Sequence, residues 1–126
     1  MEKIPFIIYG AGGHARVALD AARLVGLFPK WIVDDSPIQS NIFGVPIISS
    51  SDKCWLELNH FKYLVAVGSN SVRCSIFLKL LKKGGEPCTI IHPSATISAA
   101  ATIGAGTVVM AGVQVNSCAT IGSNVI

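Results

Sequence analysis

The sequence predicts an α/β fold in two parts: a parallel sheet with crossover helices over residues 1–90, then a β-helical solenoid over residues 91–126. Two observations support this prediction. In the first part, short apolar runs alternate with helical patterns through glycine-rich turns, which is typical of parallel strands joined by helices. In the second part, six hexads follow one another: IHPSAT, ISAAAT, IGAGTV, VMAGVQ, VNSCAT and IGSNVI. A fixed period of six residues indicates the stacked coils of a solenoid.

The composition excludes several classes of protein. Hydrophobic residues make up 51% of the 126 residues and charged residues 13%, which indicates a buried chain rather than a disordered one. No apolar run approaches the roughly 20 residues that span a bilayer, and we expect a cytoplasmic protein without a membrane partner. A formal charge of +3 is too small to predict nucleic-acid binding. The four cysteines are scattered, so we expect reduced thiols and no metal site.

The first predicted elements are a strand, a glycine-rich turn and a helix. Residues 4–9 form an apolar run that predicts a buried strand. The turn GAGGHA follows at residues 10–15, and the apolar pattern after it predicts a helix that ends at Gly26 and Pro29.

The middle of the α/β part is predicted to hold a strand and a short helix. The strand covers residues 31–33, and a turn-rich stretch follows over residues 36–50. The helix covers residues 52–58, and either Ser50 or Ser51 is expected to cap its N-terminus.

The last elements of this part are a strand, a helix and a final strand. Residues 63–67 predict a buried strand that runs into the turn GSNS at residues 68–71. A helix follows and ends at Gly84 and Gly85, and residues 89–91 are expected to form the last strand of the sheet. The side chains expected on the buried face of the helix are those of Val72, Ile76, Leu80 and Leu81.

The turns after the first two strands carry residues suited to a nucleotide. Gly10, Gly12 and Ala15 match the pattern G-x-G-x-x-A, in which backbone N–H groups at a helix start can face phosphate oxygens. A glycine-rich turn without a ligand is the alternative. Asp34 and Asp35 follow about 20 residues later, as expected for carboxylates that bind ribose hydroxyls or a base. A solvated strand end is the alternative for this pair.

Other polar residues are expected at the same rim. His14 could donate a hydrogen bond to a phosphate or a sugar, or cap the helix without a ligand. Asn70 and Arg73 follow the end of the third strand, and Arg73 could pair with a phosphate or with a neighbouring carboxylate. The sequence shows no arrangement of a nucleophile with a base, so we name no catalytic residue.

The length of the α/β part limits the ligand. About 90 residues correspond to one mononucleotide-binding half of a doubly wound fold. The sequence therefore favours a single nucleotide with a short extension over a nicotinamide dinucleotide, and it disfavours an oxidoreductase.

The order of these motifs resembles a known family. The segments are YGAGGHARV after the first strand, DD after the second, LVAVGSN with an arginine three residues later, and IHPSATI before the hexads. They are similar to the bacterial nucleotide-sugar and sialic-acid acetyltransferases of the PglD and NeuD type, over essentially the whole chain. The resemblance implies a Rossmann-like domain that binds a UDP-sugar or sialic-acid-type substrate, a left-handed β-helix that binds acetyl-CoA, and a homotrimer through the β-helix. Handedness and trimer are implied by the resemblance alone.

The motifs and the resemblance together predict a set of substrate-binding residues. They are Gly10, Gly12, Gly13, His14, Asp34, Asp35, Gly68, Ser69, Asn70 and Arg73. By resemblance, Gly12, Gly13 and His14 would approach the phosphates and the sugar, and the two aspartates would approach the uridine. The residues from Gly68 onward would face the other side of the nucleotide.

The resemblance also implies a mechanism. In the family, a histidine oriented by an acidic residue takes a proton from the sugar amine or hydroxyl as it attacks the thioester of acetyl-CoA. None of His14, His60 and His92 matches that histidine, which lies on the coil after the sixth hexad. We therefore expect a fragment of a longer acyltransferase, inactive alone, that holds mainly the sugar-nucleotide-binding part. The alternative is a non-catalytic nucleotide-sugar-binding and oligomerising module.

Overall fold

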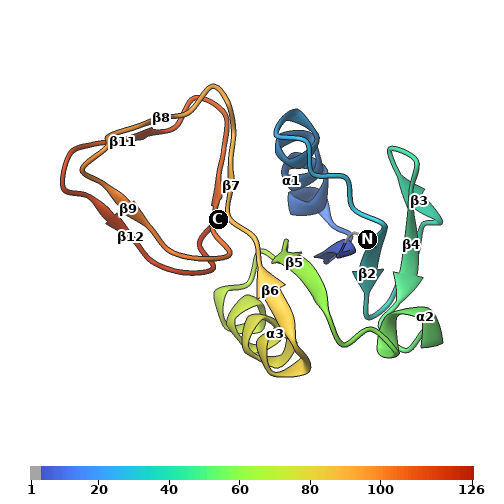
Figure 1. Ribbon diagram of the computed structural model, residues 1–126. Helices are drawn as coiled ribbons and strands as arrows, with labels where there is room; N and C mark the ends of the chain where they lie inside the picture. The colour runs from blue at the N-terminus through green and yellow to red at the C-terminus, as the bar shows by residue number, and fades with distance from the viewer. Residues whose placement is uncertain (1–3) are drawn as a thin grey trace.

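The structure consists of an α/β part and a triangular coil beside it (Figure 1). The computed structural model describes residues 4–126, so the first three residues of the part predicted over 1–90 lie outside the described residues. Within this range, a six-stranded sheet with helices forms the first part, and three two-stranded sheets form the coil. The predicted fold class, a parallel α/β sheet followed by two coils of a β-helix, is confirmed.

The sheet is centred on β1 and has the order β3-β4-β2-β1-β5-β6. Its strands are β1 (Phe6–Tyr9), β2 (Trp31–Asp34), β3 (Asn41–Ile42), β4 (Val45–Ser49), β5 (Phe61–Val65) and β6 (Gly85–Pro87). All neighbouring strands are parallel except β3 and β4. The chain builds outward through β2 and β4 on one side and through β5 and β6 on the other. The topological switch point, where open α/β sheets bind ligands, therefore lies between β1 and β5.

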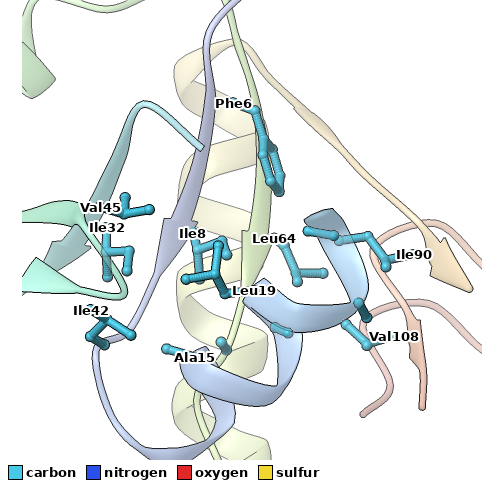
Figure 2. Packing of buried hydrophobic residues seen from close by; sticks show 14 of the residues in the cluster. Phe6, Ile8, Ala15, Leu19, Ile32, Ile42, Val45, Leu64, Ile90 and Val108 are labelled. Atoms are coloured by element: carbon cyan, nitrogen blue, oxygen red, sulfur yellow. The ribbon is translucent and has the colours of Figure 1, made fainter. Parts of the chain in front are cut away.

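The helices cover both faces of the sheet. They are α1 (Gly13–Leu24), α2 (Lys53–Leu56) and α3 (Asn70–Lys83). Side chains alternate along β1, so Ile8 packs in the cluster that contains α1, while Ile7 packs in the cluster that contains residues of α2 and α3. Leu19 of α1 lies near Ile8 and Leu64 in Figure 2. Trp55 of α2 is buried in the second cluster.

The six hexads form two coils. The strands are β7 (Ile90–Ile91), β8 (Thr96–Ile97), β9 (Thr102–Ile103), β10 (Val108–Val109), β11 (Gln114–Val115) and β12 (Thr120–Ile121). Each strand of the first coil pairs in parallel with the strand three hexads later, and the pairs form the three sides of the triangle in Figure 1. Positive φ angles recur at the fourth position of the last four hexads, at Gly106, Gly112, Cys118 and Asn124. The period predicted the stacking, and these positive φ angles mark corners of the coils.

The β-helix packs against the α/β part on its α1 side and on its α3 side. Ile90 and Val108, one from each coil, are buried in the same cluster as Leu64 and the apolar face of α1 (Figure 2). On the α3 side, a Cβ built on Gly106 would lie 2.7 Å from the ring of Phe77, so this ring lies directly against a corner of the first coil.

The chain leaves the sheet earlier than the sequence predicted. The last strand of the sheet is β6, which begins at Gly85, whereas the prediction placed the last strand at residues 89–91. Ile90 and Ile91 instead form β7 of the β-helix. The sequence of β6 is Gly-Glu-Pro, which has no apolar run, so an edge strand of this kind leaves no periodic signal.

A hairpin occupies the stretch predicted as turns over residues 36–50. Strands β3 and β4 are antiparallel, and β4 adds to the sheet beside β2. Phe43 and Gly44 have φ angles of 47° and 85° and form its two-residue turn. Pro46 interrupts the apolar pattern of β4, and the prediction therefore missed this strand.

The cap of α2 and the buried face of α3 also differ from the predictions. Asp52 caps α2 by accepting a hydrogen bond from the backbone N–H of Cys54, so the prediction of a serine cap was wrong. On α3, Leu80 is buried, but Val72 and Leu81 are each 47% exposed. The β-helix packs beside α3 and shifts the buried side of the helix away from these two residues.

Candidate functional site

The candidate site lies at the carboxyl ends of β1, β2 and β5. Because these strands are parallel neighbours, the segments that follow them meet at one edge of the sheet. The structure brings Gly12, Asp34 and Gly68 to this edge from segments far apart in the sequence. The three strand ends that the sequence predicted to converge do so.

Gly10 has a structural role in this edge. Its φ angle is 110°, and a Cβ built on it would lie 2.6 Å from the carbonyl oxygen of Ala66. Its N–H also donates to the carbonyl oxygen of Val33 at 2.7 Å. Glycine at position 10 therefore allows the ends of β1, β2 and β5 to lie close together. Its backbone N–H donates within the fold and is not available to a ligand.

Gly12 and Gly13 face open space at the start of α1. Gly12 is the N-cap of this twelve-residue helix and offers no side-chain cap. No heavy atom counted as a neighbour lies within 4 Å of a Cβ built on Gly12 or on Gly13. The first backbone N–H groups of a helix have no partner inside the helix and carry a partial positive charge. This end of α1 can therefore accept a phosphate group.

Asp34 lines a small cleft beside these glycines. Its Oδ1 accepts a hydrogen bond from the N–H of Ala11 at 3.2 Å, and its Oδ2 accepts one from the N–H of Ser36 at 3.0 Å. The cleft has a volume of about 210 Å³. Its lining residues are Ala11, Gly12, Asp34, Ser36, Ile38, Gln39 and Ile47. A carboxylate oxygen has lone pairs for a second bond, so Asp34 can also accept from a ligand hydroxyl.

Asp35 lies apart from Asp34, although the sequence placed the pair at one ligand. Asp35 lines a different cleft, of about 370 Å³, together with Tyr9, Ser71 and Lys79. The phenol of Tyr9 donates a hydrogen bond to Asp35 Oδ1. This bond holds the pKa of Asp35 below its ordinary value, and burial followed by the same bond raises the pKa of Tyr9 to about 12. Of the two aspartates, Asp34 shares a cleft with the glycine turn.

His14 forms the wall of the candidate site opposite the Asp34 cleft. Its side chain is exposed at the start of α1, and its Nε2 would lie 3.1 Å from a Cβ built on Gly68. The imidazole therefore lies against the backbone of the segment after β5. This contact joins the two sides of the topological switch point.

The residues after Gly68 build the start of α3. Ser69 is the N-cap of this helix, and its Oγ accepts a hydrogen bond from the N–H of Val72. Asn70 accepts a hydrogen bond from Arg73 at 2.7 Å through its side-chain oxygen. The other partners of Arg73 are the backbone carbonyl oxygens of Val67, Gly68 and Asn124. The sequence predicted a phosphate or a carboxylate as the partner of Arg73, and the partners in the structure are carbonyl and amide oxygens.

Among the residues that line the Asp34 cleft but were not predicted from the sequence, three follow the second strand: Ser36, Ile38 and Gln39. Ile38 is 94% exposed, which is unusual for an isoleucine beside a polar cleft. The signal for all three was their position directly after the second strand, at the ligand-binding end of the sheet. The hairpin β3–β4 folds back at this point and makes the cleft, and the prediction did not include this hairpin.

The described range, residues 4–126, contains no group of three or more His, Cys, Asp or Glu side chains that could hold a metal ion. None of the helices found in this range is both long and apolar enough to cross a membrane.

Residues 5–80 match the PglD N-terminal domain family. Among solved structures, the chain is similar to a histidine-to-asparagine mutant of perosamine N-acetyltransferase from Caulobacter crescentus in complex with CoA and GDP-perosamine, with 33% identity and a TM-score of 0.84 over 95% of this chain and 58% of the other. It is also similar to the acetyltransferase domain of PglB from Neisseria gonorrhoeae in complex with acetyl coenzyme A, with 33% identity and a TM-score of 0.73 over 98% of this chain and 66% of the other.

The chain thus spans 58% to 66% of the length of these sugar acetyltransferase structures. The family match covers the strand ends at which the candidate site lies, and the similarity to the solved structures extends over both parts of the chain. The chain therefore belongs to the PglD N-terminal domain family through its α/β part, and the two β-helix coils follow that domain.

Proposed function

We propose that this chain is the nucleotide-sugar-binding part, with two β-helix coils, of an enzyme that transfers an acetyl group from acetyl-CoA to a nucleotide-activated sugar. The observation that carries the proposal is the open N-terminus of α1 at Gly12 and Gly13, between the cleft at Asp34 and the wall formed by His14 and Gly68. A nucleoside diphosphate sugar has the chemistry that this order of groups requires: a nucleoside at one end, phosphates in the middle, and a sugar beyond them.

Each group in the site has a role in this proposal. The N–H groups at the start of α1 bind phosphate oxygens through hydrogen bonds and the helix dipole. Asp34 accepts hydrogen bonds from ribose hydroxyls in the cleft. His14 donates a hydrogen bond to a phosphate or to the sugar. Asp35 is a weaker candidate for the base than the sequence suggested, because its carboxylate lies in the other cleft with Tyr9.

The transfer itself follows from the chemistry of the two substrates. The sugar amine attacks the thioester carbonyl, a C–N bond forms, the C–S bond breaks, and coenzyme A leaves as a thiol. A general base takes the proton that the amine loses. We assign no residue of this chain to that base.

The proposal also includes a homotrimer assembled through the β-helix. Analytical ultracentrifugation of the chain tests this oligomeric state.

Isothermal titration of the chain with a sugar nucleotide tests the binding function. UDP-N-acetylglucosamine and GDP-mannose are suitable probes, because the family resemblance implies a UDP-sugar whereas the Caulobacter relative is described with a GDP-sugar. We expect one of them to bind with micromolar to millimolar affinity, and Gly12→Ala to abolish the binding. Tight binding of NADH, or no binding of either sugar nucleotide, would contradict the proposal.

A second assay tests whether this chain alone catalyses the transfer. Thiol release from acetyl-CoA is measured with a nucleotide-activated amino-sugar as acceptor. Turnover supports the transferase. Binding of the sugar nucleotide without turnover by this chain is the result expected both of the proposed nucleotide-sugar-binding part and of the binding and oligomerising module.

A further inference from the structure

Arg73 is buried although it carries a charge. Only 9% of its surface is exposed, and it lies in the first turn of α3. A buried charge is costly unless its hydrogen bonds are satisfied. The oxygens that accept hydrogen bonds from Arg73 within residues 4–126 are carbonyl and amide oxygens rather than carboxylate oxygens.

These hydrogen bonds point in two directions. Toward the candidate site, Nη1 donates to the carbonyl oxygens of Val67 at 2.9 Å and Gly68 at 3.3 Å, and Nη2 donates to Oδ1 of Asn70 at 2.7 Å. Toward the β-helix, Nε donates to the carbonyl oxygen of Asn124 at 2.8 Å. One guanidinium group therefore contacts the segment that faces His14 and a corner of the second coil, 51 residues away.

The corner at Asn124 is itself tied to the first coil. Asn124 has a φ angle of 58°, and its N–H donates to the carbonyl oxygen of Ala105 at 3.0 Å. The neighbouring Gly106 lies against the ring of Phe77, one turn further along α3 than Arg73. Helix α3 thus contacts two stacked corners of the β-helix, and Arg73 is the residue that also contacts the site.

We infer that Arg73 is a positioning residue that couples the nucleotide-sugar site to the second coil of the β-helix. The planar guanidinium holds the carbonyl oxygens of Val67 and Gly68 and that of Asn124 in one fixed geometry. A bound sugar nucleotide that orders the segment after β5 therefore also orders the corner at Asn124. This inference rests on the proposed function, since it assigns the coupling to that same site.

Arg73→Lys is the informative variant. Lysine keeps the charge but has a single ammonium group, which cannot reproduce the planar fork that reaches both segments. Arg73→Ala removes all the hydrogen bonds and serves as the stronger variant if it folds. Lys82→Ala is the matched control, because Lys82 is an exposed cation on the same helix.

The test is amide hydrogen exchange of the 126-residue chain, read by NMR in residues 68–70 and 123–125. Without ligand, we expect Arg73→Lys to raise the exchange rates in both segments at least about fivefold, with β1 and β2 unchanged. With saturating UDP-N-acetylglucosamine or GDP-mannose, exchange in residues 123–125 slows in the wild type and in Lys82→Ala, but not in Arg73→Lys. The sugar nucleotide binds Arg73→Lys about five- to tenfold more weakly, within the range of ordinary coupling between sites.

The outcomes separate this inference from the proposed function. If neither sugar nucleotide binds the wild type, the proposed function fails, and the ligand-free comparison still decides whether Arg73 links the two segments. Unchanged exchange in the second segment of ligand-free Arg73→Lys would overturn the inference. So would ligand-induced slowing that persists in this variant at saturation.

Discussion

The imidazole of His14 lies against the backbone of Gly68, so closely that a Cβ on Gly68 would lie 3.1 Å from Nε2 and 3.3 Å from Cδ2 of the ring. His14 belongs to the first turn of α1, and Gly68 follows β5. The contact therefore sets the width of the candidate site across the topological switch point. It also explains why a residue without a side chain stands at position 68.

We predict that Gly68→Ala weakens sugar-nucleotide binding about tenfold, which corresponds to about 1.4 kcal/mol. The added methyl group displaces His14 by a few tenths of an ångström or turns its ring away. Gly68 does not have a positive φ angle, so alanine fits the backbone. The free energy of unfolding should therefore change by only about 0.5 kcal/mol. Calorimetric titration and urea denaturation measure the two quantities.

Two further variants show whether the effect passes through His14. Gly122→Ala is the control, since a Cβ there has no neighbouring heavy atom within 4 Å, and its binding should match that of the wild type. Adding Gly68→Ala to His14→Ala should weaken binding less than adding it to the wild type. Equal effects in both backgrounds would show that the contact does not matter for binding.

Gly10 and Gly12 are predicted to respond in opposite ways to alanine. Gly10→Ala forces a side chain into a positive φ angle and against the carbonyl oxygen of Ala66, so we expect a loss of about 3 kcal/mol in the free energy of unfolding. Gly12→Ala fits an extended backbone and open space, so the free energy of unfolding should fall by only about 1 kcal/mol, the usual preference for glycine over alanine at an N-cap. Its methyl group would instead occupy the approach of the phosphates and abolish binding.

The comparison of these two variants separates a structural glycine from a ligand-binding one. Denaturation curves and titrations of both proteins provide the measurement. A stable Gly12→Ala protein that binds the sugar nucleotide normally would place the phosphates elsewhere.

The sequence predicted the elements with strong periodicity and missed those whose form depends on distant contacts. The hexads and the glycine turn at residues 10–15 are local signals, and both were placed correctly. The hairpin β3–β4 was missed because Pro46 breaks its pattern, although its turn at Phe43 and Gly44 brings Ile47 back beside Asp34 to line the cleft. The pairing of β4 with β2 depends on this hairpin, which leaves no local signal.

Arg73 shows the same limit at a single residue. An arginine at a helix start beside a ligand-binding turn predicts a phosphate contact. Its Nε instead donates to the carbonyl oxygen of Asn124, a partner that only the packing of the β-helix brings near. Asp34 and Asp35 line separate clefts for a local reason, because adjacent residues at a strand end point to opposite sides of the sheet.

Tyr9→Phe is predicted to raise the pKa of Asp35 toward its ordinary value, because it removes the hydrogen bond that favours the ionised carboxyl. The native pKa is lowered, so the stability from this bond is fully present above the unfolded pKa of about 4 and is lost as the pH falls through the native pKa. The difference between wild type and variant, about 1 kcal/mol near neutral pH, should therefore shrink in acid.

Carboxyl ¹³C shifts of Asp35 and urea denaturation between about pH 2 and pH 7 measure both effects. Tyr63→Phe is the control, because Tyr63 is also a buried phenol but donates to the carbonyl oxygen of Phe77. It should leave the pKa of Asp35 unchanged. A stability difference for Tyr9→Phe that stays constant with pH would contradict the assignment.

Ile38 is predicted to pack against the nucleobase. It is 94% exposed in the cleft that contains Asp34 and Gln39, so it contributes almost no burial to the fold. A base in this cleft would cover part of the side chain, and about 25 cal/mol is gained for each Å² of apolar surface removed from water. Ile38→Ser should therefore weaken sugar-nucleotide binding about three- to tenfold and change the free energy of unfolding by less than about 0.5 kcal/mol.

Phe28→Ser provides the matched control for Ile38→Ser. Phe28 is 69% exposed and lines a different hollow, with Pro5 and Phe6 at the start of β1, so its loss should leave sugar-nucleotide binding unchanged. Calorimetric titration with UDP-N-acetylglucosamine and GDP-mannose compares the variants. If Ile38→Ser binds both nucleotides as well as the wild type does, the base lies outside the Asp34 cleft. The cleft shared by Tyr9 and Asp35 would then be the next place to test, because it lies at the same edge of the sheet.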